Sequence, residues 1–405
     1  MYIIQKKTAS RLVATSMAVA LLASPVSSIL SGPEHVAAAA PVVGKSTLNL
    51  KPIWTKTLGE PSRLNTQATL IKNNLYFTVG KKYVAFDALA GKTRWTYPAE
   101  AVSQTVKDDK SVWFTDATGR LIKLNAATGK LQWKVKTQSQ PGKKESYVSL
   151  SLHEADGVIY VGDEYGLTAY NASSGKVKWK LKGSNHGYNL LQTGNILVAS
   201  TTINGALTTS GLQGIDAKTG KVKWKLTDGD HRDILFSNGK SFYTRDVTEG
   251  IDAGYAANID EINLNNGKIM ATHSYIPVDF VEAQSASDVV SDGNYFYVIE
   301  KYDENQKKAV VSRFPMDSRS KSEPDKTYVF EAGVSEWSLG ENGIAYIRLE
   351  NGNLLTLDTD TGRTLASVHY KGVSLPTLIG QDVLVVQHGG HISGVKKAAA
   401  SRSRE

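Results

Sequence analysis

A short pattern recurs along most of this 405-residue chain, and it constrains the fold more than any other feature. Each copy has an apolar segment that ends in Asp or Asn, a Gly four residues later, and a second segment that carries Trp in four copies. Successive glycines are 38 to 47 residues apart, except for a last gap of 95 residues that accommodates two units. A period of about 40 to 50 residues is that of one four-stranded β-propeller blade. The glycines are Gly91, Gly129, Gly175, Gly220, Gly267 and Gly362.

The pattern predicts two β-strands joined by a tight hairpin. The Asp or Asn side chain caps the turn, and Gly takes the backbone conformation with positive φ. Two further strands precede each hairpin, for example at 67–73 and 75–80, and again at 150–154 and 158–162. Each unit therefore has four strands, A to D, and the Gly turn joins strand C to strand D.

Strand D is predicted to alternate strictly between its two faces. In the third copy, Val177, Trp179 and Leu181 would point one way, and Lys178 and Lys180 the other. Lysines on the outermost strand of a blade discourage pairing with the sheet edges of other molecules. We therefore interpret these lysines as structural.

The two ends of the repeat region predict one shared blade. Residues 53–58 resemble a D strand without its blade, and 375–379, 382–387 and 391–396 resemble A, B and C strands without a D strand. A degenerate copy at 311–320 lacks the Gly but is counted as a blade. Seven C–D turns then lie within the chain, and the shared blade is the eighth.

The sequence therefore predicts an all-β fold, an eight-bladed β-propeller of four-stranded antiparallel blades over 41–397. Joining the N-terminal and C-terminal strands in one blade closes the ring and removes a free sheet edge. If the copy at 311–320 is not a blade, the ring has seven blades. Residues 398–405 are predicted to be a disordered tail.

The N-terminal segment has the features of a secretory signal peptide. Three basic residues precede an uncharged apolar run at 12–22, and small residues follow at 36–40. We expect 1–40 to be removed by cleavage after Ala39 or Ala40. The alternative is an uncleaved membrane anchor, which is disfavoured because the apolar run is shorter than the roughly 20 residues needed to span a bilayer.

The amino-acid composition limits the cell compartment of this protein and the kinds of functional site that it can contain. The chain contains no Cys, which excludes disulfides, thiolate metal sites, cysteine nucleophiles and a lipid attached through cysteine. No second apolar run of spanning length follows, so the mature chain is predicted to be secreted and to have no transmembrane segment. The formal net charge of +8 falls to +6 once 1–40 are removed, which suits anionic partners. Because the lysines do not gather in one cluster, we expect no specific nucleic-acid site.

The repeat resembles that of the quinoprotein-type, or PQQ-like, β-propeller family, and the resemblance covers nearly all of 48–396. It implies that the tryptophans dock between neighbouring blades around the ring. In two blades Ala271 and Ala366 stand in place of the Trp, so docking there must differ. The implied docking residues are Trp54, Trp95, Trp133, Trp179 and Trp224.

The family contains PQQ-dependent dehydrogenases and also propellers without catalytic activity. The alcohol dehydrogenases resemble one another in a vicinal cysteine pair over the cofactor, a calcium ion and long insertions. This chain has no Cys and little more than eight blades. We therefore predict a non-enzymatic protein that has no cofactor.

Two polar clusters contain residue types that can bind a metal ion. The segment 228–233 carries carboxylates that suit calcium, but it lacks a completing Glu and includes His231 and Arg232. His388 and His391 suit zinc, but no third ligand is evident. We interpret both as polar loops and predict no metal site.

The predicted binding site is the face on which the B–C and D–A loops emerge. These loops are extended at 201–214, 244–260 and 301–309, and long loops on a rigid scaffold often carry binding residues. The same loops are equally compatible with insertions that have no function. The candidate binding residues are Asp230, Arg232, Arg245, Asp246, Glu249, Tyr255 and Tyr302.

The expected function is that of a secreted, monomeric scaffold that binds an unidentified protein or an anionic envelope polymer. Two alternatives remain. One is a module that binds a small ligand or a sugar, and the other is a PQQ-dependent dehydrogenase.

The secreted protein is expected to begin at Ala40 or Pro41, because signal peptidase cuts after small residues. Intact-mass measurement of the protein from culture supernatant checks this. A protein found in a membrane fraction with Met1 retained would contradict the export prediction.

Overall fold

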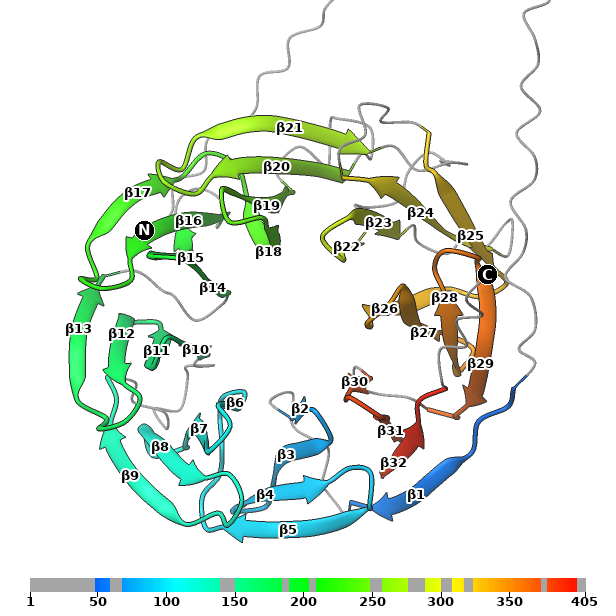
Figure 1. Cartoon of the computed structure of the whole chain (residues 1–405), viewed down its shortest axis with the longest axis horizontal. Coiled ribbons are helices and arrows are strands. Elements are labelled where there is room, and N and C mark those ends of the chain that lie inside the picture. The colour runs from blue at the N-terminus through cyan, green and yellow to red at the C-terminus, as the bar shows by residue number, and fades with distance from the viewer. Residues whose placement is uncertain are drawn as a thin grey trace, which may run out of the picture. The chain divides into compact units, whose positions relative to one another are not determined.

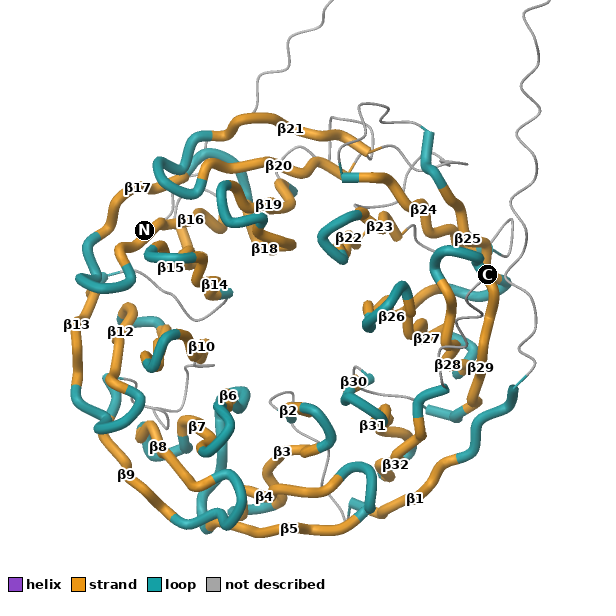
Figure 2. The backbone as a smooth tube through the Cα atoms, viewed as in Figure 1, coloured by secondary structure: helices purple, strands orange, loops and turns teal. Residues whose placement is uncertain are grey.

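The computed structural model describes 48–58, 68–138, 150–183, 189–203, 209–247, 257–275, 288–299, 308–316, 323–372 and 377–398. The predicted signal peptide and almost all of the predicted tail lie outside these residues. Within them, 32 β-strands form eight four-stranded sheets. Figure 2 shows that the described chain consists of strands and their connections. No helix of the described residues is long and apolar enough to cross a bilayer.

The sheets follow one another around a ring, with the A strands nearest the centre and the D strands at the outer rim (Figure 1). Strands that are neighbours in a blade run antiparallel, as in blade 1. The predicted all-β, eight-bladed propeller is confirmed.

Each blade contains its strands in the order A to D. Blade 1 has β2 (Thr69–Ile71), β3 (Asn74–Val79), β4 (Lys82–Asp87) and β5 (Lys92–Tyr97), and blade 2 has β6 (Val106–Lys107), β7 (Ser111–Thr115), β8 (Arg120–Asn125) and β9 (Leu131–Lys136). Blade 3 has β10 (Ser151–Ala155), β11 (Val158–Asp163), β12 (Gly166–Asn171) and β13 (Val177–Lys182), and blade 4 has β14 (Leu190–Thr193), β15 (Ile196–Ile203), β16 (Thr209–Asp216) and β17 (Val222–Leu226). Blade 5 has β18 (His231–Ser237), β19 (Ser241–Asp246), β20 (Ala257–Asn263) and β21 (Ile269–Tyr275), and blade 6 has β22 (Asp288–Ser291), β23 (Tyr295–Ile299), β24 (Ala309–Pro315) and β25 (Lys326–Phe330). Blade 7 has β26 (Val334–Leu339), β27 (Ile344–Leu349), β28 (Asn353–Asp358) and β29 (Arg363–His369), and blade 8 has β30 (Leu378–Ile379), β31 (Val383–His388), β32 (His391–Lys396) and β1 (Pro52–Thr57).

Blade 8 joins the two ends of the repeat region. β1 pairs antiparallel with β32, and the sheet order is β1-β32-β31-β30. Thr55 and Ser393 are opposite each other in this pair, and their hydroxyl oxygens are 2.8 Å apart. The shared closing blade is therefore confirmed. The degenerate copy supplies strand C of blade 6, so the seven-bladed alternative is wrong.

Strand D does not alternate strictly, which corrects the sequence prediction. Trp179 pairs with Ala169, but the next pair in the ladder is Val177 with Tyr170, so Lys178 is an extra residue in a β-bulge. The bulge turns Val177 away from the face that buries Trp179, and Val177 is 46% exposed. The D strands of blades 1, 2, 4, 5, 7 and 8 have the same register shift. Because a bulge bends and twists a strand, it fits strand D to the curved rim.

The hydrophobic core lies between the blades. One cluster of buried side chains occupies each of the eight interfaces, so every blade packs one face on the blade before it and the other on the blade after it. The middle strands are buried on both faces, and all six residues of β11 are buried. Between blades 1 and 2, Tyr83 stacks on Phe114 with ring centroids 3.9 Å apart.

Removing 41–58, which contains β1, is expected to expose the edge of β32 and to unpack the cluster between blades 8 and 1. The shortened protein should aggregate or lose its cooperative unfolding transition. Thermal denaturation followed by circular dichroism checks this, and removal of 398–405 is the control that should change nothing. Equal melting temperatures for the two truncated proteins would show that the shared blade is not needed for closure.

Candidate binding face

Neighbouring blades are joined by a contact between a Trp of one blade and the Gly turn of the next. The indole of Trp95, on strand D of blade 1, lies against Gly129 in the C–D turn of blade 2. A Cβ atom added to Gly129 would lie 2.6 Å from the indole, and φ is +68°, so both the space and the backbone require glycine. The same contact joins Trp54 to Gly91, Trp133 to Gly175, Trp179 to Gly220 and Trp224 to Gly267.

The indole N–H completes this contact in four blades. Nε1 donates over 2.6 to 3.0 Å to the backbone carbonyl of the residue that follows the turn Asp or Asn in the next blade, and the accepting residues are Ala88, Ala126, Ala217 and Leu264. The residue opposite the Trp on strand C is always small in these blades, namely Ala85, Ala169, Gly214 or Gly394. A Cβ atom on Gly214 would overlap the indole of Trp224. A small residue therefore makes room for the ring.

Blade 2 uses a lysine as the donor. Lys123 lies opposite Trp133, and its Nζ donates over 3.0 Å to the carbonyl of Ala172, the equivalent acceptor in blade 3. Nε1 of Trp133 then has no hydrogen-bond partner among the described residues. Burial lowers the pKa of Lys123, although Asp108 raises it. The ammonium group also lies 4.9 Å from the centre of the Trp113 ring.

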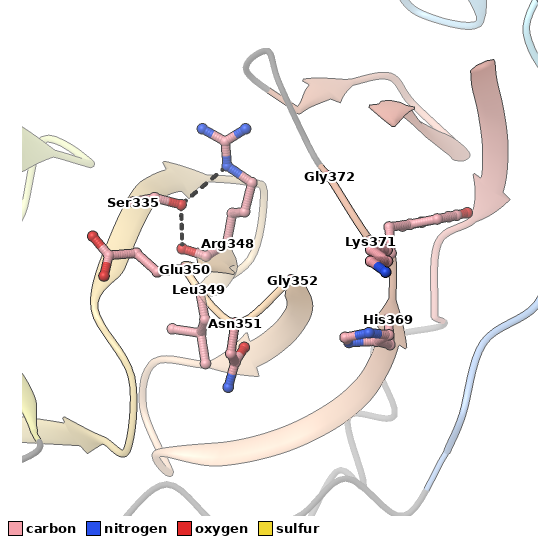
Figure 3. Close-up of a pocket in the computed structure, with 10 residues that line it drawn as sticks. Ser335, Arg348, Leu349, Glu350, Asn351, Gly352, His369, Lys371 and Gly372 are labelled. Atoms are coloured by element: carbon pink, nitrogen blue, oxygen red, sulfur yellow. Dashed lines mark hydrogen bonds between the residues drawn. The ribbon is translucent and has the colours of Figure 1, made fainter. Parts of the chain in front are cut away.

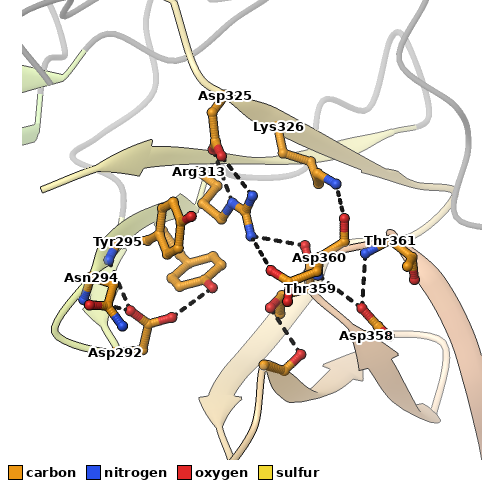
Figure 4. Close-up of polar contacts among 12 residues, drawn as sticks. Asp292, Asn294, Tyr295, Arg313, Asp325, Lys326, Asp358, Thr359, Asp360 and Thr361 are labelled. Atoms are coloured by element: carbon orange, nitrogen blue, oxygen red, sulfur yellow. Dashed lines mark hydrogen bonds and ion pairs between the residues drawn. The ribbon is translucent and has the colours of Figure 1, made fainter. Parts of the chain in front are cut away.

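Blade 6 has no Trp at this position, and the docking carbonyl of blade 7, that of Thr359, accepts from Arg313 (Figure 4) and from the hydroxyl of Tyr328 over 2.5 Å. Nη1 of Arg313 donates to the carbonyl of Thr359 and to Oδ1 of Asp360 in blade 7, each over 3.1 Å. Its Nε and Nη2 donate to the carboxylate of Asp325 over 3.0 and 2.6 Å. Thr359 follows the turn Asp of blade 7, so the arginine reaches the same carbonyl that the indoles reach elsewhere. A buried charge thus holds blades 6 and 7 together.

Three of the predicted binding residues lie at the end of blade 5 where the D–A and B–C connections meet. Arg245 is only 7% exposed, and its Nη1 lies 3.7 Å from Oδ1 of Asp288 in blade 6. Oδ1 of Asp246 accepts the backbone N–H of Asp230 over 2.9 Å, and Oδ1 of Asp230 accepts that of Ser210 in blade 4 over 2.8 Å. These side chains therefore join the connections of blades 4, 5 and 6.

The other predicted binding residues are not brought together by the described structure. Arg232 belongs to β18, and its side chain lies outside the described part of the chain. Glu249, Tyr255 and Tyr302 lie in connections that are also outside it. Their role in binding stays a prediction.

The two histidines near the C-terminus each have a local partner. Nε2 of His388 lies 2.8 Å from the hydroxyl of Ser393, and Nδ1 of His391 lies 2.9 Å from the carbonyl of Gly389. Burial lowers the pKa of His388, and His391 lowers it further. The pair stabilises the B–C turn of blade 8.

A polar groove of about 420 Å³ lies at the same end of blade 7 (Figure 3). Its walls are the B–C turn at 350–352 and the start of the D–A connection at 369–372. Three basic side chains and one carboxylate line it, together with neutral polar groups: Arg348, His369, Lys371, Glu350, Ser335 and Asn351. Such a groove suits an anionic segment with hydroxyl or amide groups.

Local contacts hold the shape of this groove. Nε of Arg348 donates to the hydroxyl of Ser335 over 3.1 Å and lies 3.5 Å from the carboxylate of Glu336. Glu336 in turn accepts the backbone N–H of Thr377 in blade 8. Gly352 has φ +88°, and a Cβ atom there would overlap the next wall, so only glycine allows this close approach.

The sequence did not indicate this groove because its loops are short. Extended loops are the usual sequence signal for a binding face, whereas the B–C turn of blade 7 has only the residues 350–352 between its strands. A local signal was nevertheless present: basic residues at 348 and 371 flank both connections of one blade.

The ring, the glycine turns and the docked indoles define a PQQ-like propeller, and comparisons with known proteins agree. The family model described as outer membrane protein assembly factor BamB matches 13–135, 49–246 and 151–365. Because these overlapping matches cover more than half of the chain, the chain belongs to this family of PQQ-like repeat propellers. None of the curated proteins compared with the chain matches it.

Solved structures share the fold at low sequence identity. BamB from Moraxella catarrhalis is 14% identical, with a TM-score of 0.56 over 86% of this chain and 100% of the other. The quinohemoprotein alcohol dehydrogenase from Comamonas testosteroni is 14% identical, with a TM-score of 0.58 over 88% of this chain and 78% of the other. The C-terminal WD40 domain of Sif2 is 12% identical, with a TM-score of 0.57 over 88% of this chain and 100% of the other. These likenesses show the fold, and they include a dehydrogenase as well as an assembly factor.

Lys123 and Arg313 act as docking donors where no indole does, and mutation of each to Ala should affect the stability of the protein differently. Lys123→Ala is expected to leave the melting temperature unchanged or to raise it, because the indole of Trp133 can then donate to the carbonyl of Ala172. Arg313→Ala should reduce the free energy of unfolding by about 2–3 kcal/mol, because Asp325 and Asp360 lose their charged partner. The hydroxyl of Tyr328 still donates to the carbonyl of Thr359 in this variant. Urea denaturation measures both changes. Equal losses in the two variants would contradict this difference and would mean that the indole of Trp133 does not replace Lys123 at the carbonyl of Ala172.

Proposed function

We propose that this protein is a secreted, non-catalytic scaffold that binds an anionic polymer or an acidic protein segment through the face of the B–C and D–A loops. The observation that carries the proposal is the groove of blade 7, which Arg348, His369 and Lys371 line together with the carboxylate of Glu350. Arg348 is the most shielded of these groups, with a side chain 15% exposed, and Glu336 at 3.5 Å compensates its charge, so the exposed Lys371 is the group most open to an anionic ligand.

Rigidity and charge both support binding at this groove. Its walls are held by Gly352 and by the contacts of Arg348 and Glu336, so little conformational entropy is lost when a ligand binds. The net positive charge of the chain steers anionic partners toward it. The predicted residues Asp230, Arg232, Arg245, Asp246, Glu249, Tyr255 and Tyr302 would extend the same face over blades 5 and 6.

Family membership supports a role at the cell envelope. The matching family model is described as an outer membrane assembly factor, and the N-terminal segment has signal-peptide features. A dehydrogenase is less well supported, because the chain has no Cys to form the vicinal pair that resemblance to the alcohol dehydrogenases would require.

A second groove favours small-ligand binding as the second candidate function. It has a volume of about 490 Å³ and lies at the opposite end of blades 6 and 7, among their A–B turns. Carboxylate, amide and aromatic groups line it, which are groups that recognise sugar hydroxyls; they include Asp292, Asn294, Tyr295, Glu341, Asn342 and Asp360. Tyr295 and Asp292 are labelled in Figure 4, and the guanidinium of Arg313 stacks on the Tyr295 ring, 4.1 Å from its centre.

Reversing the charge of a single lysine distinguishes binding at the groove of blade 7 from general attraction between the basic protein and anions. Lys371→Glu is expected to weaken binding of poly-glutamate or poly(glycerol phosphate) at least about tenfold, which corresponds to about 1.4 kcal/mol. Lys178→Glu makes the same charge change on the rim of blade 3 and is the matched control. Fluorescence titration at fixed ionic strength measures both.

Equal weakening by Lys371→Glu and Lys178→Glu would mean that the chain attracts polyanions without a defined site. Unchanged binding in Lys371→Glu would exclude the groove. The melting temperature of both variants should match that of the unaltered protein, because both lysines are exposed.

A further inference from the structure

Three adjacent strands of blade 5 bring together one histidine and two aspartates. His231 is the first residue of β18, Asp246 is the last of β19, and Asp260 lies in β20. His231 and Asp246 are paired across the ladder, and Asp260 pairs with Thr244. One donor atom from each of the three side chains lies within 4.8 Å of the other two.

The imidazole makes its contacts through the nitrogen that faces this cluster. Nε2 of His231 lies 3.8 Å from Oδ2 of Asp260 and 3.0 Å from the backbone carbonyl of Asp228. Its Nδ1 has no hydrogen-bond partner among the described residues, although the side chain is 0% exposed. Two donor atoms bound to one metal ion at about 2.0–2.3 Å lie roughly 3–4 Å apart, and the 3.8 Å between Nε2 of His231 and Oδ2 of Asp260 falls within this range.

Burial makes the negative charge of this cluster costly. Asp260 is 3% exposed, and its Oδ1 accepts a hydrogen bond from the hydroxyl of Thr272 over 2.6 Å. Buried carboxylates are stable when they are paired or when they coordinate a cation.

The repeat itself does not require the carboxylate of Asp260. It lies three residues before the turn Asn of its blade, and the other seven blades have uncharged residues there: Val84, Ile122, Thr168, Gln213, Ser312, Leu355 and Ser393. Because the equivalent residues of the other blades are uncharged, the buried carboxylate of Asp260 has a role that is specific to blade 5.

The connection between blades 4 and 5 passes directly over the donor atoms. Gly229 has φ +88°, and a Cβ atom there would lie 2.8 Å from both Oδ2 of Asp246 and Nε2 of His231. Any other residue would fill the space in front of these two atoms. Glycine leaves that space open while the connection covers the cluster.

We propose that blade 5 binds one divalent transition-metal ion through Nε2 of His231 and the carboxylates of Asp246 and Asp260. An imidazole with carboxylates suits zinc or manganese, whereas calcium prefers oxygen ligands alone. The ion joins three strands beneath the connection from blade 4, and the carbonyl of Asp228 is close enough to contribute.

This proposal revises the prediction of no metal site. The segment 228–233 by itself lacks the Glu that would complete a calcium loop and includes His231 and Arg232, but strand pairing brings carboxylates from β19 and β20 to His231. The inference goes beyond the proposed binding function and concerns neither groove.

Isothermal titration of the chelator-treated mature protein with zinc, manganese and calcium chlorides tests the site. We expect one zinc or manganese ion for each chain and at least tenfold weaker binding of calcium. Asp246→Asn should weaken zinc or manganese binding at least tenfold. Asp163→Asn is the matched control and should bind like the unaltered protein, because Asp163 occupies the same repeat position at the end of strand B in blade 3.

The melting temperature of the unaltered protein should rise when the bound ion is present, and that of Asp246→Asn should not. Absence of stoichiometric binding to the unaltered protein would overturn the proposal, whatever the variants do. Unchanged affinity in Asp246→Asn, or an equal loss in Asp163→Asn, would also overturn it. Because no polymer or peptide is used, this outcome is independent of the test of the blade 7 groove.

Discussion

The fold depends on the contact between one blade and the turn of the next. A tryptophan on strand D covers the glycine of the following C–D turn, and its N–H donates to a backbone carbonyl of that turn. Two interfaces in which no indole donates still meet the need for a donor at this carbonyl. Lys123 meets it between blades 2 and 3, and Arg313 meets it between blades 6 and 7. The interface therefore tolerates a change of side chain as long as the hydrogen bond is kept.

Because of this docking contact, the two ends of each blade have different roles. The glycine turns and docking donors lie at the C–D end, where any change disturbs a neighbouring blade. The B–C and D–A connections lie at the opposite end, where length and charge can vary without affecting the docking. The groove of blade 7 and the histidine–aspartate cluster of blade 5 both lie at this second end. The repeat thus provides a rigid ring on which local substitutions create different sites.

The similarity to solved structures concerns the ring that the docking contacts build, and not the B–C and D–A connections at which the two sites lie. An assembly factor, a dehydrogenase and a WD40 domain share the ring with this chain at 12–14% identity. A fold carries many activities, so the chemistry has to be derived from the residues of each site. In this protein that chemistry is a basic groove with fixed walls and a buried set of nitrogen and oxygen donors. Both are compatible with a scaffold, and neither depends on a cysteine.

The sequence by itself determined the propeller repeat, the glycine turns and the closing of the ring by β1, because these follow from a period and from turns of a few residues. It favoured eight blades over seven, and the strand pairing of blade 6 decided between them. The sequence did not show the departure of strand D from alternation, since the bulge at Lys178 is seen only in the pairing of strands C and D. Only the tertiary structure placed Lys123 and Arg313 at the docking carbonyls, and only it showed the blade 7 groove. It also assembled His231, Asp246 and Asp260, which are separated along the chain by intervening strands. Such groups meet through strand register and packing between blades, and these depend on residues far apart in sequence, so no local pattern specifies them.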